Sequence, residues 1–369
     1  MLKRYKLKDY DFGLVIMLIA ISVIGVLAVG SARASVQDRQ IIGLILGVFL
    51  MIVISLFDYS FFLNFYWVFY VLNIVLLLSV SLFGKEVGGA QRWVNLLGIQ
   101  FQPSETAKII LILFYAQFIM KHRSTLNTFK TLATLVLLLC PPLLLIYKQP
   151  DLSTSIMVGI IFCILVFIGG LSYKIIFGIL AVIVPAFVIF LSLVLQPNQD
   201  LIKDYQQTRI LAWLQPAKYA NAEGYQQTNA ITAIGSGQLF GKGLNNNIIG
   251  SVKNGNFISE PQTDFIFAII GEELGFIGSC IVIILLLLIA LKCVMIAKKA
   301  KDLSGTLICI GMAALIGFQS FMNISVATGL LPNTGIPLPF VSYGLTSLVS
   351  LFVGMGFVLN VRLQNTKKY

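Results

Sequence analysis

The sequence predicts an all-α integral membrane protein with about ten transmembrane helices, and composition is the first observation that predicts it. Hydrophobic residues make up 58% of the 369 residues, charged residues only 11%, and the mean hydropathy is +0.92. Soluble domains carry about 25% charged residues, so this chain has too few charges for a soluble surface. A helix needs about 20 apolar residues to cross a bilayer, and the chain has room for many such crossings.

The order of apolar runs is the second observation. Runs bounded by polar or turn residues predict spans at 12–30, 40–57, 63–83, 103–120, 130–147, 152–169, 173–195, 264–291, 304–328 and 342–361. The first run follows a basic N-terminus, but it is longer than the core of a signal peptide, which is about 7 to 15 residues. We therefore expect an uncleaved first span and a single membrane domain over 1–369.

The distribution of charge is the third observation. Most of the 26 Lys and Arg residues fall on the side of the membrane that holds both predicted termini. The positive-inside rule assigns that side to the cytoplasm. The net charge of +11 is then explained by topology, and no nucleic-acid partner is expected.

The longest connection, 197–263, is predicted to be a large, partly ordered extracellular loop. Connections this long are usually functional or disordered, and amphipathic stretches at 205–214 and 225–234 favour partial order. The glycine cluster at 235–243 resembles a phosphate-binding loop only weakly, because no Ser or Thr follows Lys242. We interpret it as a tight, turn-rich loop.

The only histidine, His122, lies in a predicted cytoplasmic loop. A histidine triad, a zinc site of the HExxH type and a histidine proton relay are therefore excluded on the outer side. The chemistry must come from other ionisable residues near the outer boundary. A charge near the bilayer centre costs at least about 2.5 kcal/mol, so such residues usually mark function.

The first candidate group precedes and opens the fourth span. It comprises Arg92, Trp93, Gln102, Ser104, Glu105 and Lys108. Pro103 favours the first turn of a helix, and an acid is favourable at that end. Glu105 and Lys108 share a helix face and can pair. They are interpreted either as a structural ion pair or as part of a substrate site.

The second candidate group is Gln262, Thr263 and Asp264, at the outer end of the eighth span. Partial burial there would raise the pKa of the Asp264 carboxyl group and suit it to act as a general base. The alternative is that Asp264 caps the helix. Glu272 and Glu273 lie deeper and are interpreted as structural.

Two outward connections, 148–154 and 331–344, form the third group. The second contains Ser342 and Tyr343, and its prolines and glycines exclude a continuous helix. Non-helical backbone at membrane depth is tolerated where it lines a cavity or is buried in protein. We therefore expect several outer loops to converge on an outward-facing polar cavity.

Together these motifs resemble the SEDS family of cell-wall proteins, which includes RodA, FtsW and SpoVE. The matching segments occur in family order and are 89–93, 102–108, 149–154, Tyr225 with 233–237 and 241–244, 263–265 with 272–275, and 335–344. The sequence departs from the family pattern at Ser153, Ser259 and Leu345. The basic N-terminus is more similar to the elongation branch, RodA, than to the division or sporulation branches.

The resemblance implies a peptidoglycan glycosyltransferase that polymerises lipid II at the outer face of the bacterial cytoplasmic (inner) membrane. It also implies a class B penicillin-binding protein as partner. The essential aspartate of the family falls on Asp264. The residues implied to bind substrate are Arg92, Trp93, Gln102, Ser104, Glu105, Lys108, Gln262, Thr263, Ser342 and Tyr343.

The resulting hypothesis makes Asp264 the general base for the acceptor 4-hydroxyl group. Arg92, Lys108 or a divalent cation, Mg²⁺ or Mn²⁺, would offset the charge that develops on the leaving pyrophosphate. No organic cofactor is expected. The competing hypotheses are a flippase for lipid-linked precursors and a non-enzymatic scaffold. Polar intramembrane residues cluster at the outer end of the spans, which favours the polymerase.

Overall fold

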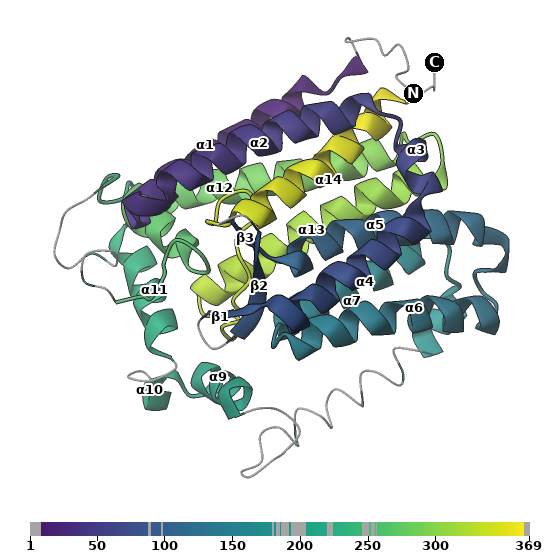
Figure 1. Ribbon diagram of the computed structural model, residues 1–369. Helices are drawn as coiled ribbons and strands as arrows, with labels where there is room; N and C mark the ends of the chain where they lie inside the picture. Colours follow the sequence, from purple (N-terminus) through teal and green to yellow (C-terminus); the bar gives the residue numbers. More distant parts are fainter. Residues whose placement is uncertain are drawn as a thin grey trace.

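The computed structural model describes residues 9–87, 90–96, 99–178, 204–219, 224–245 and 257–364, with the single residues 181, 185, 192, 251 and 255. Long helices form a bundle (Figure 1). The first and last described residues lie at one end of this bundle, and the helices of the long connection lie at the opposite end.

The long helices of the first half are α1 (Phe12–Ala32), α2 (Gln37–Leu56), α4 (Tyr66–Phe83), α5 (Pro103–Lys121), α6 (Phe129–Lys148) and α7 (Leu152–Ile168). Short helical turns lie between them: η2 (Ala34–Val36), α3 (Tyr59–Asn64) and η3 (Arg123–Thr125). The second half contains α9 (Asp204–Leu214), α10 (Pro216–Tyr219), α11 (Tyr225–Ser236), α12 (Ile266–Ala297), α13 (Leu303–Ala327) and α14 (Leu345–Leu363). The described long helices overlap the ranges predicted from apolar runs. Of the predicted span 173–195, the structure describes 173–178 and the single residues 181, 185 and 192, and the rest lies outside the described residues.

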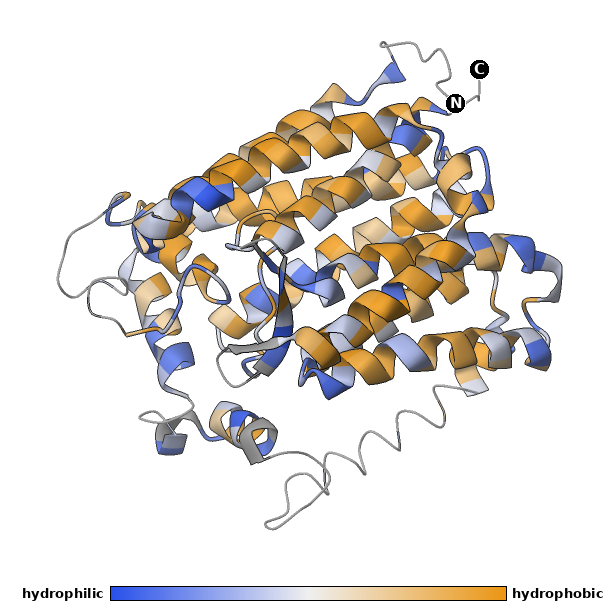
Figure 2. Cartoon of the chain, viewed as in Figure 1, coloured by the Kyte–Doolittle hydropathy of each residue, from blue (hydrophilic) through white to orange (hydrophobic). Residues whose placement is uncertain are grey.

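Within the described ranges, seven helices are long and apolar enough to cross a membrane. The helix α5 is not among them because it carries charged residues, and α7 is only 17 residues long. Hydrophobic residues run along the helices, whereas hydrophilic residues gather at their ends (Figure 2). Large apolar side chains such as Ile45 and Leu137 remain 65% and 69% exposed, as lipid-facing residues do. The chain is a multi-pass membrane protein.

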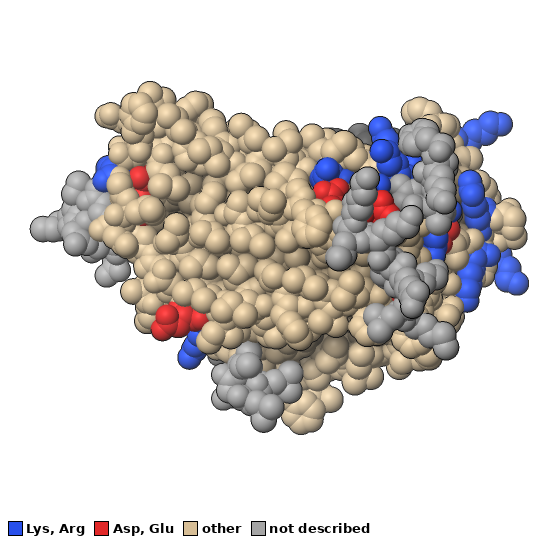
Figure 3. Space-filling view, turned by 90° about the horizontal axis from the view of Figure 1, so that it is seen from above, with Lys and Arg blue, Asp and Glu red and all other residues tan. Residues whose placement is uncertain are grey.

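Charged side chains are unevenly distributed between the two ends of the bundle. In Figure 3, Lys and Arg residues gather at the end that holds the chain termini, and a wide uncharged band covers the middle of the visible face. The bundle therefore has one end that is more basic than the rest of the visible face.

The helix α5 lies at the centre of the bundle, packed against α4, α7, α13 and α14. All of its residues from 107 to 119 are buried, which is typical of a helix surrounded by other helices. A charged side chain on this helix cannot reach solvent along most of its length. Its charges therefore need partners inside the protein.

The connection between α4 and α5 forms a small sheet that the sequence analysis did not predict. The strands β1 (Lys85–Val87), β2 (Ala90–Leu96) and β3 (Ile99–Phe101) are antiparallel and lie in the order β1-β2-β3. Two of the strands have only three residues, and the seven residues of β2 (AQRWVNL) do not alternate strictly between polar and apolar, which is the pattern that identifies a strand in a sequence. The sheet matters because β2 carries Arg92 and Trp93.

The helix α12 is broken at Gly275, whose φ of 66° and ψ of −162° are not helical. The glycine-rich connection after α11 packs into this break. The backbone N–H groups of Lys242 and Gly243 donate to the carbonyl groups of Glu272 and Glu273, both at 3.0 Å. The connection therefore satisfies carbonyl groups that the broken helix leaves unpaired.

The close packing at this break explains the glycine cluster. A Cβ atom on Gly237 would lie 1.9 Å from the carbonyl oxygen of Gly271, and one on Gly241 would lie 2.2 Å from that of Glu273. The Lys242 side chain pairs with Glu272 at 2.8 Å. The cluster thus joins the long connection to α12, in agreement with its interpretation as a tight loop.

Candidate active site

A buried ion pair lies near the start of α5. Lys108 Nζ donates to Glu105 Oε1 at 2.8 Å, and the two side chains are only 3% and 4% exposed. Removing either partner would leave an uncompensated charge in the centre of the bundle, which is strongly destabilising. The ion pair that the spacing of Glu105 and Lys108 predicts is present in the structure.

The pair is extended by two amides of α13, Gln319 and Asn323. Lys108 Nζ also donates to Gln319 Oε1 at 3.1 Å, and Gln319 Nε2 donates to the carbonyl of Pro337 at 3.0 Å. One turn further along, Asn323 Nδ2 donates to the carbonyl of Ile336 at 2.7 Å. These bonds link the ion pair of α5 to the irregular segment before α14.

The same asparagine connects this network to Asp264, because its Nδ2 also donates to the Asp264 carbonyl at 2.8 Å. Asp264 lies two residues before α12, and Phe265 occupies the N-cap position without a side-chain hydrogen bond to the helix. The interpretation of Asp264 as a helix cap is therefore wrong. Its half-buried carboxyl group faces Gly335, where an added Cβ would lie 3.3 Å from Asp264 Oδ2.

The surroundings of Asp264 raise the pKa of its carboxyl group from 3.8 to about 6. Burial is the largest cause, because it disfavours the charged form. The guanidinium groups of Arg209 and Arg92 act in the opposite direction, and the carboxylates of Glu260 and Asp151 add to the rise. Such a pKa, near the pH of its surroundings, suits a general base.

Arg92 reaches this region from β2. Its Nε donates to the carbonyl of Gln149 at 3.2 Å, and its Nη2 donates to the carbonyl of Pro150. Trp93 lies opposite Lys85 in the β1–β2 ladder, whereas the next pair joins Glu86 to Gln91. Arg92 is therefore the extra residue of a β-bulge, which interrupts the regular alternation of side chains and redirects them locally.

The segment before α12 and the segment before α14 hold each other in place. Ser342 Oγ donates to the carbonyl of Thr263 at 2.6 Å, and the Tyr343 N–H donates to the carbonyl of Gln262 at 2.8 Å. Ser342 Oγ also accepts from the Leu338 N–H at 2.7 Å. The predicted site residues Gln262, Thr263, Ser342 and Tyr343 therefore lie together. The hydroxyl group of Ser342 is used in the hydrogen bonds that join the two segments.

Several buried polar atoms around Asp264 have no hydrogen-bond partner within the described part of the chain. They are Gln262 Oε1, Asn323 Oδ1 and Thr334 Oγ1. Buried polar groups are nearly always hydrogen-bonded, and exceptions gather where a polar ligand or water binds. These three atoms, like others elsewhere in the described bundle, can form hydrogen bonds with water or a polar ligand.

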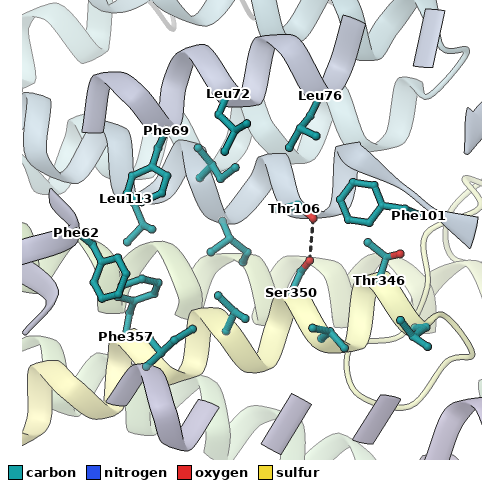
Figure 4. Close-up of a pocket in the computed structure, with 16 residues that line it drawn as sticks. Phe62, Phe69, Leu72, Leu76, Phe101, Thr106, Leu113, Thr346, Ser350 and Phe357 are labelled. Carbon is teal, nitrogen blue, oxygen red and sulfur yellow. Dashed lines mark hydrogen bonds between the residues drawn. The ribbon is translucent and has the colours of Figure 1, made fainter. Parts of the chain in front are cut away.

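Gln102 and Ser104 lie at the start of α5. Gln102 Nε2 donates to Ser104 Oγ at 3.2 Å, and the Gln102 N–H donates to Thr346 Oγ1 of α14 at 3.3 Å. Thr346 also lines an apolar cavity of about 420 Å³ between α4, α5 and α14. Figure 4 shows its lining, with apolar side chains on all three helices and a Thr106–Ser350 contact of 3.1 Å.

The described residues contain no group of three or more His, Cys, Asp or Glu side chains that could hold a metal ion. Dedicated metal sites use several converging ligands. The side chains beside Asp264 in this part of the chain do not form such a cage.

The sequence analysis missed three residues of this site. Gln319 and Asn323 are polar, four residues apart and therefore on one face of an otherwise apolar helix, a pattern that could have identified them. Arg209 gave no comparable signal, because nothing in the sequence of the long connection indicates which residue approaches Asp264.

The fold and the site define a multi-pass membrane protein with a half-buried carboxylate whose pKa is affected by two arginines, together with a buried ion network and an apolar cavity. The FtsW/RodA/SpoVE family model, described as "Cell cycle protein", matches residues 6–367. The chain belongs to this family, which confirms the resemblance found in the motifs.

Similar proteins include a probable peptidoglycan glycosyltransferase FtsW from Bacillus subtilis (strain 168), 34% identical over 100% of this chain and 95% of that protein. The peptidoglycan glycosyltransferase MrdB of Escherichia coli (strain K12) is also 34% identical, over 95% of this chain and 93% of that protein.

Two solved structures share the fold. One concerns the structural coordination of polymerization and crosslinking by a peptidoglycan synthase complex, with a TM-score of 0.80, 28% identity and coverage of 97% of this chain and 99% of that chain. The other is the crystal structure of the rod shape determining protein RodA of Thermus thermophilus, with a TM-score of 0.70, 27% identity and coverage of 97% and 98%.

Proposed function

We propose that this chain is a peptidoglycan glycosyltransferase that polymerises lipid II into glycan strands at the outer face of the bacterial cytoplasmic membrane. The observation that carries the proposal is the half-buried carboxyl group of Asp264, with a raised pKa and two arginines acting on it. Family membership supports the enzyme class, since the FtsW and MrdB relatives are named peptidoglycan glycosyltransferases.

The reaction forms a bond between the acceptor 4-hydroxyl oxygen and the anomeric carbon of the donor sugar. The bond from that carbon to the lipid pyrophosphate breaks, and the pyrophosphate leaves with the bonding electrons. Asp264 takes the proton of the acceptor hydroxyl group as general base. Positive charge beside the leaving group stabilises the transition state, and Arg92 is the predicted site residue that supplies it.

Lys108 is proposed to have a structural role. Its ammonium group is bound by Glu105 and Gln319, so it supports the segment that holds Asp264 rather than meeting the pyrophosphate directly. We propose that a divalent cation would be bound chiefly by the substrate phosphates, with only one or two carboxylates of the protein, as Mg²⁺ commonly is.

The apolar cavity between α4, α5 and α14 supports a lipid-linked substrate. Its lining is almost entirely hydrocarbon, from Phe101 and Thr346 at one end to Phe62 and Phe357 at the other (Figure 4). An acyl or polyprenyl chain gains about 0.8 kcal/mol per buried CH₂. The cavity would therefore hold the lipid tail while the sugars extend toward Asp264.

The distribution of charge supports the orientation. The basic end of the bundle holds the termini (Figure 3), and the positive-inside rule assigns that end to the cytoplasm. Asp264 and the α9–α11 segment then lie outside, where lipid II is polymerised.

A class B penicillin-binding protein is the proposed partner. A structural neighbour belongs to a peptidoglycan synthase complex that coordinates polymerization and crosslinking, which supports a crosslinking enzyme as the companion of this chain. The elongation role is proposed from the N-terminal resemblance to RodA. The FtsW and MrdB relatives are equally identical to this chain, at 34%.

The test is glycan synthesis from lipid II by the detergent-purified protein with its partner, using Asp264→Asn. We expect long glycan strands from the wild type and at least a roughly 100-fold loss in the variant, as general-base removal gives. A flippase or scaffold would give no polymer from the wild type.

Asp38→Asn is the matched control, because Asp38 is an exposed carboxylate in the first turn of α2. It should retain the wild-type rate. An Asp264→Asn protein that polymerises as fast as this control would exclude Asp264 as the base.

A further inference from the structure

The long connection is fastened to the segment that precedes α14. Trp213 Nε1 of α9 donates to the carbonyl of Gly329 at 3.1 Å. Gln227 Nε2 of α11 donates to the carbonyls of Val326 and Leu331 at 2.8 and 2.7 Å. Both helices therefore hold the end of α13 and the start of the segment that carries Gly335 to the Asp264 carboxyl group.

Arg209 lies one turn before Trp213 on α9. Its Nη1 lies 3.5 Å from the carbonyl oxygen of Asn333, two residues before Gly335. The fold thereby places a guanidinium group beside the stretch of backbone that faces Asp264. Of the charges that act on Asp264, that of Arg209 has the largest effect, larger than that of Arg92.

The two arginines approach from different loops. Arg92 is held by the carbonyls of Gln149 and Pro150, between α6 and α7. Arg209 lies against the segment between α13 and α14. The two segments meet where Ser153 Oγ, in the first turn of α7, donates to the carbonyl of Thr334, so the two guanidinium groups are bound to segments that contact each other.

We propose that Arg209 binds the diphosphate group of a lipid-linked substrate, opposite Arg92, and that α9 of the long connection is thereby part of the active site. This inference rests on the proposed glycosyltransferase function. Arginine suits the role, because its planar guanidinium group binds phosphate oxygens through two hydrogen bonds. Gln262 Oε1, two residues before Asp264 in the chain, and Thr334 Oγ1, next to Gly335, have hydrogen-bonding capacity that a polar ligand could use.

Two diphosphates take part in each addition, one on the donor and one on the acceptor. Both have the chemistry that Arg209 would recognise. Arg209→Gln removes the positive charge. Arg209→Lys keeps the charge but loses the planar guanidinium group and its paired N–H donors. Lys218→Gln is the matched control, because Lys218 is an exposed cation on the neighbouring α10.

The measurements are the initial rate of glycan synthesis against lipid II concentration and inhibition by undecaprenyl pyrophosphate, with co-purification of the partner as the test of folding. Loss of a charge-assisted contact predicts a change of about 10- to 100-fold in Arg209→Gln. A raised KM for lipid II places Arg209 at the acceptor diphosphate. A raised inhibition constant for undecaprenyl pyrophosphate places it at the donor. Both results support the inference.

The pH profile separates this role from a structural one. The charges that face Asp264 are Arg209 of α9, Arg92 of β2, Glu260 before α12 and Asp151 before α7. Removing the positive charge of Arg209 should move the acid limb of kcat/KM to higher pH in Arg209→Gln, whereas Arg209→Lys should keep the wild-type limb. A residue that only braces Asn333 would move neither.

Wild-type kinetics and an unchanged acid limb in a folded Arg209→Gln protein would overturn the inference. Absence of polymer from the wild type would instead overturn the proposed function, so the two failures are distinguishable. Lys218→Gln should match the wild type in every measurement.

Discussion

Burial and two arginines act in opposite directions on the carboxyl group of Asp264, and burial has the larger effect. An ordinary aspartate has a pKa of about 3.9 and would be ionised but weakly basic at neutral pH. A pKa of about 6 leaves Asp264 ionised above that pH and makes it a better proton acceptor. The environment thus prepares this residue for its proposed role.

The pH dependence follows from this shift. The base must be ionised, so kcat/KM should be constant above about pH 7 and fall roughly tenfold per pH unit below the pKa of about 6. The measurement is initial glycan synthesis between pH 4.5 and 8, a range chosen to bracket that pKa, with about 6 as the expected midpoint. An acid limb near pH 4, at the ordinary aspartate pKa of about 3.9, would contradict it.

The effect of rising pH on folding stability is opposite to its effect on kcat/KM. A raised carboxyl pKa means that the folded state prefers the protonated form, so ionisation of Asp264 costs folding free energy as pH rises through about 6. Asp264→Asn should therefore melt at the same or a higher temperature than the wild type at pH 8. Lost activity in that variant would then not be a consequence of unfolding.

At the scale of elements, the glycine-rich connection and the broken helix α12 depend on each other. The break at Gly275 leaves carbonyls that Lys242 and Gly243 satisfy. The contact is so close that side chains are excluded from it. This arrangement joins the long connection, which carries Arg209, to the helix that follows Asp264.

Gly237→Ala should be strongly destabilising, because the added Cβ would lie 1.9 Å from the carbonyl oxygen of Gly271. We expect a lower melting temperature, by about 2 °C or more for a cost of about 2 kcal/mol in a chain of this size, together with reduced polymerisation. Thermal unfolding in detergent and the glycan assay measure these effects.

Gly235→Ala is the control for this substitution. It lies in α11 with no atom within 4 Å of an added Cβ, and alanine favours a helix interior over glycine by about 1 kcal/mol. Its melting temperature should equal or exceed that of the wild type. Equal behaviour of the two variants would show that the close contact does not support the fold.

At the scale of the whole molecule, the apolar cavity and the buried ion pair lie on different sides of α5, since the cavity opens between α4, α5 and α14 whereas Lys108 bonds to Gln319 of α13. Val353→Trp should fill the cavity and raise the KM for undecaprenyl-linked lipid II by about 10-fold, since about 1.4 kcal/mol of burial would be lost. A lipid II analogue with a short tail should be affected much less.

Val75→Trp serves as the comparison, because Val75 is 55% exposed on α4 and does not line the cavity. It should leave both KM values unchanged. If Val353→Trp alters neither KM, the lipid tail lies elsewhere on the protein.

Local sequence predicted the elements best where one physical requirement dominates. Apolar runs of sufficient length become long helices because unpaired backbone groups are not tolerated in lipid. The ion pair of Glu105 and Lys108 was predictable because three residues along a helix lie on one face. The break at Gly275 was not, since a glycine in an apolar run is compatible with an uninterrupted helix.

The sequence by itself determined the membrane class, the helix ranges and the family, because apolar length and motif order are local properties of the chain. It also identified Asp264 as the candidate base. Only the tertiary structure decided which side chains meet there. Arg209, Asn323 and Gly335 reach Asp264 from α9, α13 and the segment before α14, and such contacts depend on how distant segments pack, which local patterns do not encode.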